Sequence, residues 1–262
     1  MSCLLSVYVD RLKKYPAFLG KPSAEELFTC DFCSSELARL REEFRPELHA
    51  GEGDTFKRTL RLMDWVHHEL FSAGDAIRPA AFNAREILRV RKTGSAFCTH
   101  YSTVMTELLL SIGISARPLY CVPEAFDCDS HMGVLVYLPE TGRCFFADPT
   151  FNTYFEKNGR PMDIFEIRKS YAEGKPPSFR HINIDKQWEL YCAGERCETY
   201  DEWYRLYMAK NVFRFMSPAR SAYGCMDVND SAWIIANPIG FDVKNEYDRF
   251  ENAVYIHSAV TN

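Results

Sequence analysis

The chain has 262 residues, a formal net charge of −5 and a pI of about 5.8, with 47% hydrophobic, 26% charged and 14% aromatic residues. This composition is that of an ordinary globular protein and excludes a largely disordered chain. The acidic balance and the lack of a basic stripe argue against general attraction to phosphate backbones, so we expect no nucleic-acid partner.

The amino-terminal segment lacks the features of a secretory signal, because charged residues follow its short apolar run at once. No window approaches 18 uncharged apolar residues, so we expect no transmembrane helix and no membrane partner. The ten cysteines are too dispersed for a small disulfide scaffold, which predicts reduced thiols and a cytoplasmic location. Cys30 and Cys33 form a CxxC pair, but only Cys192 and Cys197 could supply a second one, so we expect no metal and no cofactor.

The first third of the chain predicts helices and one loop. A helix is expected over residues 23–44 with Ser23 as its N-cap, and a loop over residues 45–53, which contain a proline and two glycines. Apolar residues at spacings of three and four predict a second helix over about 54–71. An asparagine followed three residues later by a glutamate predicts the capped start of a short helix over residues 83–89.

The middle third predicts a helix followed by antiparallel strands. Residues 99–112 follow Cys98 with apolar residues at helical spacing and stop at a glycine. Residues 116–122 are expected to form a strand. Residues 131–138 and 143–148 are joined by Pro-Glu-Thr-Gly, and this pattern predicts a β-hairpin.

The last hundred residues carry weaker patterns. Helices are expected near residues 162–172 and 200–211, and short strands within 222–237 and 253–260. No internal repeat, low-complexity tract or long linker divides the chain. We therefore predict the fold class α+β, in a single domain over residues 1–262, with N-terminal helices packed on an antiparallel β-sheet.

Cys98 lies where a glycine-containing loop turns into the helix of residues 99–112. The first turn of a helix offers free N–H groups and the positive end of the helix dipole, which stabilise a thiolate. A histidine paired with the sulfur would complete its activation, and a carboxylate or amide would orient that histidine. Backbone amides just ahead of and at the cysteine are candidate donors to a developing oxyanion.

The predicted hairpin supplies both partners. His131 begins its first strand, and Asp148, 17 residues further along, ends the second. In an antiparallel hairpin the start of one strand lies beside the end of the next, so the imidazole and the carboxylate are expected to meet. The candidate catalytic residues are therefore Cys98, His131 and Asp148.

Four motifs in order carry a resemblance to a known family. They are Gly94-Ser-Ala-Phe-Cys98, the helix end at 112–117 (Ile-Gly-Ile-Ser-Ala-Arg), His131 before an apolar strand, and Ala147-Asp148-Pro149-Thr150. Over about residues 60–155 the chain resembles the transglutaminase-like superfamily. The resemblance implies a papain-like Cys-His-Asp core, with Cys98 as nucleophile, His131 as general base and acid, and Asp148 as its orienting group. It places the catalytic core at about 54–175 and a C-terminal extension that completes the sheet at about 176–262.

Three departures from the family pattern bear on the reaction. Many members have a tryptophan two residues after the histidine, where this chain has Gly133. The crosslinking enzymes carry an upstream tryptophan that shelters the oxyanion, and here the region reads Ala80-Ala-Phe-Asn83; their long multidomain build is also absent. The resemblance therefore implies action on an amide or peptide bond through a thioester on Cys98, with hydrolysis and acyl transfer to an amine both open.

Two alternative functions remain. Arylamine N-acetyltransferases use the same residue order with a coenzyme A thioester, although their Arg-Gly-Gly-x-Cys motif is not matched by Thr93–Cys98. A non-catalytic binding module of the same fold is the other. The expected partner is a peptide, protein or small amide substrate. His100 and Tyr101 are expected to be structural or to line the pocket wall, and Asn83 to cap its helix. Arg117 is expected to form a structural ion pair, and the aromatic group Trp203, Tyr204 and Tyr207 to belong to the core.

Overall fold

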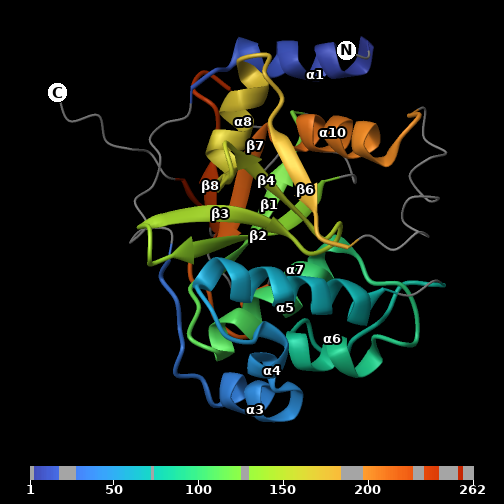
Figure 1. The fold of residues 1–262 in the computed structure, drawn as a ribbon, viewed down its shortest axis with the longest axis vertical. Coiled ribbons are helices and arrows are strands. Elements are labelled where there is room, and N and C mark those ends of the chain that lie inside the picture. The colour runs from blue at the N-terminus through green and yellow to red at the C-terminus, as the bar shows by residue number, and fades with distance from the viewer. Residues whose placement is uncertain are drawn as a thin grey trace.

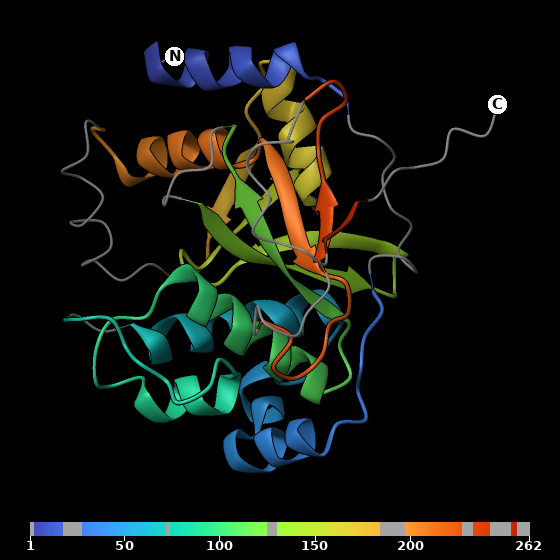
Figure 2. The same cartoon turned by 180° about the vertical axis from the view of Figure 1, so that it is seen from behind.

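The computed structural model describes residues 3–17, 28–71, 74–124, 130–183, 197–226, 233–241 and 253–255. Within them a central β-sheet lies between two groups of helices, one on each face (Figure 1). The view from behind shows the same three layers (Figure 2). Helices and an antiparallel sheet thus occupy separate layers, and the predicted α+β fold class is confirmed.

One face of the sheet is covered by the first helical layer. Its members are α3 (Ser35–Phe44), α4 (Pro46–Ala50), α5 (Thr55–Leu70), α6 (Ala84–Val90) and α7 (Cys98–Ser111). Helix α7 contacts α3, α5 and α6 as well as two strands, so it lies at the centre of this layer. Every residue from His100 to Leu110 is buried, including the polar Thr106 and Glu107, because helices and strands enclose α7 on all sides.

The sheet has nine strands in the described residues, in the order β5-β4-β3-β2-β1-β7-β8-β9, with β6 pairing with β4. The strands are β1 (Ala116–Val122), β2 (His131–Leu138), β3 (Arg143–Asp148), β4 (Thr153–Lys157), β5 (Arg160–Pro161), β6 (Ser178–His181), β7 (Arg214–Pro218), β8 (Trp233–Ala236) and β9 (Ala253–Tyr255). All pairs are antiparallel except β8 with β9. The hairpin β2–β3 pairs Val134 with Ala147, and this register brings the start of β2 near the end of β3.

The opposite face carries α1 (Cys3–Lys14), α8 (Ile164–Ala172) and α10 (Tyr200–Asn211) (Figure 1). Helix α1 packs on both α8 and α10. The core beneath these helices is rich in aromatic side chains, including Phe151, Phe155 and Tyr204, whereas the core beneath α3–α7 is mainly aliphatic. No helix in the described ranges combines the length and apolarity needed to cross a bilayer.

Most predicted elements are confirmed, and the bounds of β2, β3 and α10 agree to the residue. The helix predicted over 23–44 is wrong over residues 28–34, because Ser34 caps α3 by accepting a hydrogen bond from the Glu36 amide. Ser23 lies outside the described residues. The loop predicted over 45–53 is wrong in part, because Pro46 begins the short helix α4. Helix α1 and strands β4, β5, β6 and β7 were not predicted from the sequence.

Candidate active site

The hairpin joins the candidate imidazole to the candidate carboxylate. His131 is the first residue of β2 and Asp148 the last of β3, and both side chains are fully buried. Nε2 of His131 lies 2.7 Å from Oδ2 of Asp148, which is the distance of a charge-assisted hydrogen bond. The contact expected between these two side chains is therefore present.

Two further groups donate hydrogen bonds to the Asp148 carboxylate. The backbone amide of Phe151 donates to Oδ1 at 3.2 Å, so the turn after β3 fixes one oxygen. The hydroxyl of Tyr204 donates to Oδ2 at 2.8 Å. These two hydrogen bonds fix the orientation of the carboxylate toward the imidazole.

The charge of His131 follows from these contacts. Burial by itself lowers the pKa of His131, but the negative charge and the hydrogen bond of Asp148 raise it, and the Cys98 side chain raises it further. The net pKa rises from the ordinary 6.5 to about 10. His131 is therefore an imidazolium at neutral pH, which is the form that pairs with a thiolate.

Cys98 begins α7, the buried central helix, and its side chain is half-buried. One turn further along α7, Ser102 Oγ donates to the carbonyl oxygen of Met132 at 2.9 Å. Because Met132 follows His131 directly, this hydrogen bond fixes the first turn of α7 against the start of β2. The start of α7, which carries Cys98, is thereby held next to the start of β2, which carries His131.

Gly94 brings the loop before Cys98 close to another segment. A Cβ atom at this position would lie 2.0 Å from the carbonyl oxygen of Asp75, so no side chain fits. The amide of Ser95 donates to that same carbonyl at 2.7 Å, and the amide of Ile77 donates to the Ser95 carbonyl at 2.9 Å. The glycine of the motif is thus required by a close backbone approach that anchors the loop leading into α7.

The second ring nitrogen of His131, Nδ1, is not engaged by Asp148. Nδ1 is buried and has no hydrogen bond of standard geometry, whereas the Cys98 side chain is near enough to raise the pKa of the ring. The sulfur is therefore the neighbour available to Nδ1. Catalytic hydrogen bonds are often long in a protein without substrate and shorten when one binds.

The expected oxyanion donors are only partly available. The amide of Phe97, immediately before the cysteine, donates to Nδ1 of His100 at 2.9 Å, so it is already used. The amide of Cys98 has no hydrogen-bond acceptor in the described part of the chain and remains a candidate donor in the first turn of α7. The interpretation that the preceding amide also serves is therefore wrong for this conformation.

Aromatic side chains enclose the imidazole. The rings of Phe151 and Tyr207 each lie 5.2 Å from the ring of His131. Tyr207 and Tyr204 both come from α10, whose aromatic residues recur at helical spacing. From the sequence they were expected to be core residues. Tyr204 is buried in the core and also contacts Asp148. The helical spacing of the aromatic residues in α10 is the signal in the sequence that could have indicated that one face of this helix is buried.

Gly133, the departure from the family pattern, has a structural reason. A Cβ atom there would lie 2.3 Å from the ring of Phe146 and 2.9 Å from the carbonyl oxygen of Ala147. The Phe146 ring thus fills the space that a side chain at this position would need.

The remaining residues singled out by the sequence have structural contacts. Asn83 caps α6, as predicted, and accepts a hydrogen bond from Tyr223. Arg117 donates to the carbonyl oxygens of Pro218 and Ala219 and to Ser217, so the ion pair predicted for it is wrong among the described residues. His100 Nδ1 accepts from the Phe97 amide, which fixes the start of α7 from within.

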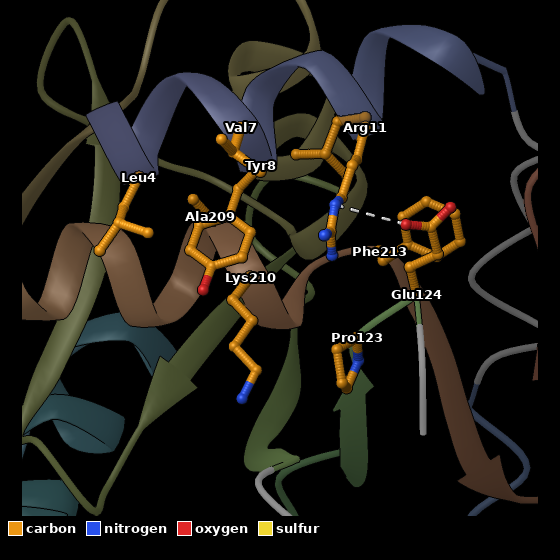
Figure 3. Close-up of a pocket in the computed structure, with 10 residues that line it drawn as sticks. Leu4, Val7, Tyr8, Arg11, Pro123, Glu124, Ala209, Lys210 and Phe213 are labelled. Carbon is orange, nitrogen blue, oxygen red and sulfur yellow. Dashed lines mark ion pairs between the residues drawn. The ribbon is translucent and has the colours of Figure 1, made fainter. Parts of the chain in front are cut away.

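Two surface hollows lie away from these residues. One, of about 270 Å³, lies between α1 and α10 and includes the ion pair of Arg11 with Glu124 (Figure 3). The other, of about 600 Å³, is lined by Trp65 and Asp64 of α5 among others. Neither hollow is lined by Cys98, His131 or Asp148.

The comparison with protein families agrees with the geometry. Residues 42–149 match the model of the transglutaminase-like superfamily. The matched segment contains Cys98, His131 and Asp148, and it confirms the resemblance drawn from the sequence. Residues 42–149 thus resemble the core of the transglutaminase-like superfamily, and this likeness supports a cysteine-dependent enzyme in general.

No curated protein matches the chain in sequence. Among solved structures, one from Cytophaga hutchinsonii, provisionally described as a cysteine protease, is similar over 57% of this chain and 43% of its own, at 15% identity and a TM-score of 0.33. The chain therefore spans less than half of that protein. At this TM-score the likeness carries no argument about the reaction.

Proposed function

We propose that this chain is a cysteine-dependent enzyme that acts on an amide or peptide bond through a thioester on Cys98. The observation that carries the proposal is the buried hydrogen bond of 2.7 Å between His131 and Asp148, beside a cysteine at the start of a buried helix. Only a paired imidazole keeps a proton in so buried a place, because burial alone would remove it.

The first half of the reaction forms the thioester. The Cys98 thiolate attacks the carbonyl carbon of the amide, and the Cys98 backbone amide donates to the oxyanion. The C–N bond then breaks, and the imidazolium of His131 gives its proton to the departing amine. The acyl group is left on sulfur and His131 is left neutral.

The second half releases the acyl group. Water or a primary amine attacks the thioester carbonyl, and neutral His131 takes a proton from the attacking group. The C–S bond breaks, Cys98 leaves as a thiolate and the thiolate–imidazolium pair is restored. The product is a carboxylic acid with water and a new amide with an amine, so the two reactions differ only in the second nucleophile.

Trapping of the acyl-enzyme tests the proposal. The wild-type protein is incubated with a library of peptide amides and acyl p-nitroanilides, quenched in acid and analysed by peptide mass spectrometry. We expect an acyl adduct on Cys98, its absence in Cys98→Ala, and its retention in the matched variant Cys33→Ala, which removes an exposed thiol. Addition of a primary amine should convert part of the acid product into the new amide if acyl transfer is the natural reaction.

The same assay separates the alternatives. An adduct formed from acetyl-coenzyme A but from no amide would support acyl transfer from a coenzyme A thioester instead. A protein that forms no adduct with any donor, and whose Cys98 reacts as an ordinary thiol, would contradict the proposal and support a binding module.

A further inference from the structure

Tyr204 reaches the candidate active site from outside the matched segment. It lies on α10, 55 residues beyond the end of the match at residue 149, and its side chain is fully buried. Its hydroxyl donates to Oδ2 of Asp148 at 2.8 Å. Nε2 of His131 lies 2.7 Å from that same oxygen.

The surrounding rings hold Tyr204 in this position. Phe155 stacks on it with a centroid distance of 5.7 Å and an interplanar angle of 25°. Phe179 meets it edge to face at 5.1 Å. Because packed aromatic contacts restrict both side-chain torsions, the hydroxyl is directed at the carboxylate without a large loss of entropy when the site forms.

Tyr204 keeps its proton over the working pH range. Burial raises its pKa, and the negative charge of Asp148 raises it further, well above the ordinary value for tyrosine. A protonated hydroxyl facing a carboxylate oxygen can only be the donor. Two donors, one from Tyr204 and one from His131, therefore compete for the electron density of one oxygen atom.

We propose that Tyr204 is a positioning residue of this site: its hydroxyl shares Oδ2 of Asp148 with His131 and so limits how tightly the carboxylate holds the imidazolium proton. The inference rests on the proposed function, because a proton held too tightly cannot be passed to a leaving amine. With Tyr204 the carboxylate still orients His131, while the imidazolium remains an effective acid.

Other titratable groups also lie near the buried pair of His131 and Asp148 and could affect the pKa of His131. They are Cys98 on α7, Cys121 on β1, His181 on β6 and Tyr207 on α10. None of them donates a hydrogen bond to Asp148, so among the described residues Tyr204 is the side chain, besides His131, that donates to the carboxylate.

The test compares Tyr204→Phe with Tyr171→Phe. The control removes another buried tyrosine hydroxyl from the same aromatic core, one that donates to the carbonyl oxygen of Arg205 at 3.2 Å and not to the site. The full chain, labelled with ¹⁵N-histidine, is titrated by NMR and the His131 ring is followed. Thermal unfolding shows whether both variants fold.

Loss of the competing donor should strengthen the bond between His131 and Asp148. In Tyr204→Phe we expect the titration midpoint of His131 to rise by about one pH unit relative to Tyr171→Phe, about the effect of one hydrogen bond to a charged group. If alkaline unfolding hides the midpoint, the Nε2–H proton resonance at pH 7 should still move downfield in Tyr204→Phe alone. An unchanged or lowered midpoint, or an unmoved resonance, would overturn the inference.

Failure of this inference can be distinguished from failure of the proposed function, because two different measurements test them. Iodoacetamide labelling of Cys98 reports whether the nucleophile is activated, and the ring titration reports whether Tyr204 acts on His131. An inert Cys98 with a shifted midpoint contradicts the function and supports the contact between Tyr204 and the buried pair. A reactive Cys98 with no shift does the reverse.

Discussion

Two regions of the molecule bury histidines to a similar degree, but one holds a charged imidazole and the other holds neutral ones. At the start of β2, His131 faces the Asp148 carboxylate at the end of β3, and its pKa rises to about 10. In the helical layer, burial lowers the pKa of His67 and of His100 to about 4. His67 faces the carbonyl oxygen of Pro149 and His100 the amide of Phe97, neither of which carries a charge.

The difference shows that a partner decides the state of a buried imidazole. Burial disfavours the charged form in all three cases, and only a buried carboxylate reverses it. His100 is the histidine nearest to Cys98 in sequence, yet it is neutral and serves to fix the helix start. The residue suited to pair with a thiolate comes from a strand 33 residues further along the chain.

The largest expected effect comes from removing the charge of Asp148, which should make the buried His131 neutral like His67 and His100. In Asp148→Asn the amide oxygen can still accept from Nε2, but its charge is gone, so burial should lower the pKa of His131 below 6.5. The pair with Cys98 is then lost, and an ordinary thiol of pKa about 8.5 is ionised to less than about one per cent at pH 6, so alkylation of Cys98 should slow about a hundredfold. The measurement is the iodoacetamide rate at pH 6.

Asp163→Asn is the matched control for that variant. Asp163 is also buried and caps α8, where asparagine caps nearly as well. Its substitution should leave the Cys98 rate unchanged, and equal losses in the two variants would contradict the role assigned to Asp148.

The second prediction concerns alkaline pH. The folded protein keeps the His131 proton up to about pH 10, whereas the unfolded chain releases it near 6.5. The resulting stabilisation is fully present below pH 6.5 and is lost as the pH rises through about 10. Because the paired Cys98 thiolate has given up one proton, the two groups offset each other between pH 6.5 and about 8.5, so urea unfolding at pH 8.5, 9.5 and 10.5 should show the decline in the wild type and a smaller one in Asp148→Asn. Parallel curves would show that the paired histidine does not contribute.

The third prediction concerns acid pH and the helical layer. The unfolded chain protonates His67 near pH 6.5, but the folded protein resists until about pH 4, so stability is lost as the pH falls between these values. The loss from this group should be roughly 2–3 kcal/mol. His67→Gln retains a donor for the Pro149 carbonyl and does not titrate, so its free energy of unfolding should fall less from pH 6.5 to 4.5.

His68→Gln serves as the control for the acid series. His68 is the exposed neighbour on the same helix, and its loss should leave the acid decline in place. An acid decline that disappears equally in both variants would place its source outside the buried ring.

The smallest effect is expected at the hydrogen bond that joins the two halves of the site. Ser102→Ala removes the donor to the Met132 carbonyl and should cost about 1 kcal/mol in the free energy of unfolding. Ser111→Ala removes a similar bond at the far, partly exposed end of α7 and should cost less. Urea unfolding of both variants measures the difference, and a larger cost in Ser111→Ala would be inconsistent with the role given to Ser102.

The sequence predicts the part of the site that local rules determine. A tight turn fixes the register of the hairpin β2–β3, so the meeting of His131 and Asp148 follows from the strand bounds alone. The start of α7 at Cys98 follows from a glycine loop and an apolar helix. The catalytic roles of these residues and the division into core and extension remain predictions.

The contacts that depend on tertiary packing could not be predicted. Tyr204 meets Asp148 across 56 residues, and nothing local to either residue indicates the pairing. Helix α3 begins later than its apolar pattern suggests, because Ser34 caps it after a segment that pairs with Ser221 far along the chain. Arg117 lacks an acidic partner in the sequence pattern around it, and its true partners are carbonyl groups about a hundred residues away.

Competitive alkylation of the cysteines in the folded protein most directly tests the central claim that Cys98 forms an ion pair with His131. The folded wild-type protein is treated with limiting iodoacetamide between pH 5 and 9, and the labelling of Cys98 is compared by mass spectrometry with that of Cys33, the exposed thiol in the same sample. We predict that Cys98 reacts far faster than Cys33 at pH 5.5 and that their rates converge toward pH 9. Two rates that rise together with pH, with Cys98 never ahead, would contradict an ion pair of Cys98 with His131.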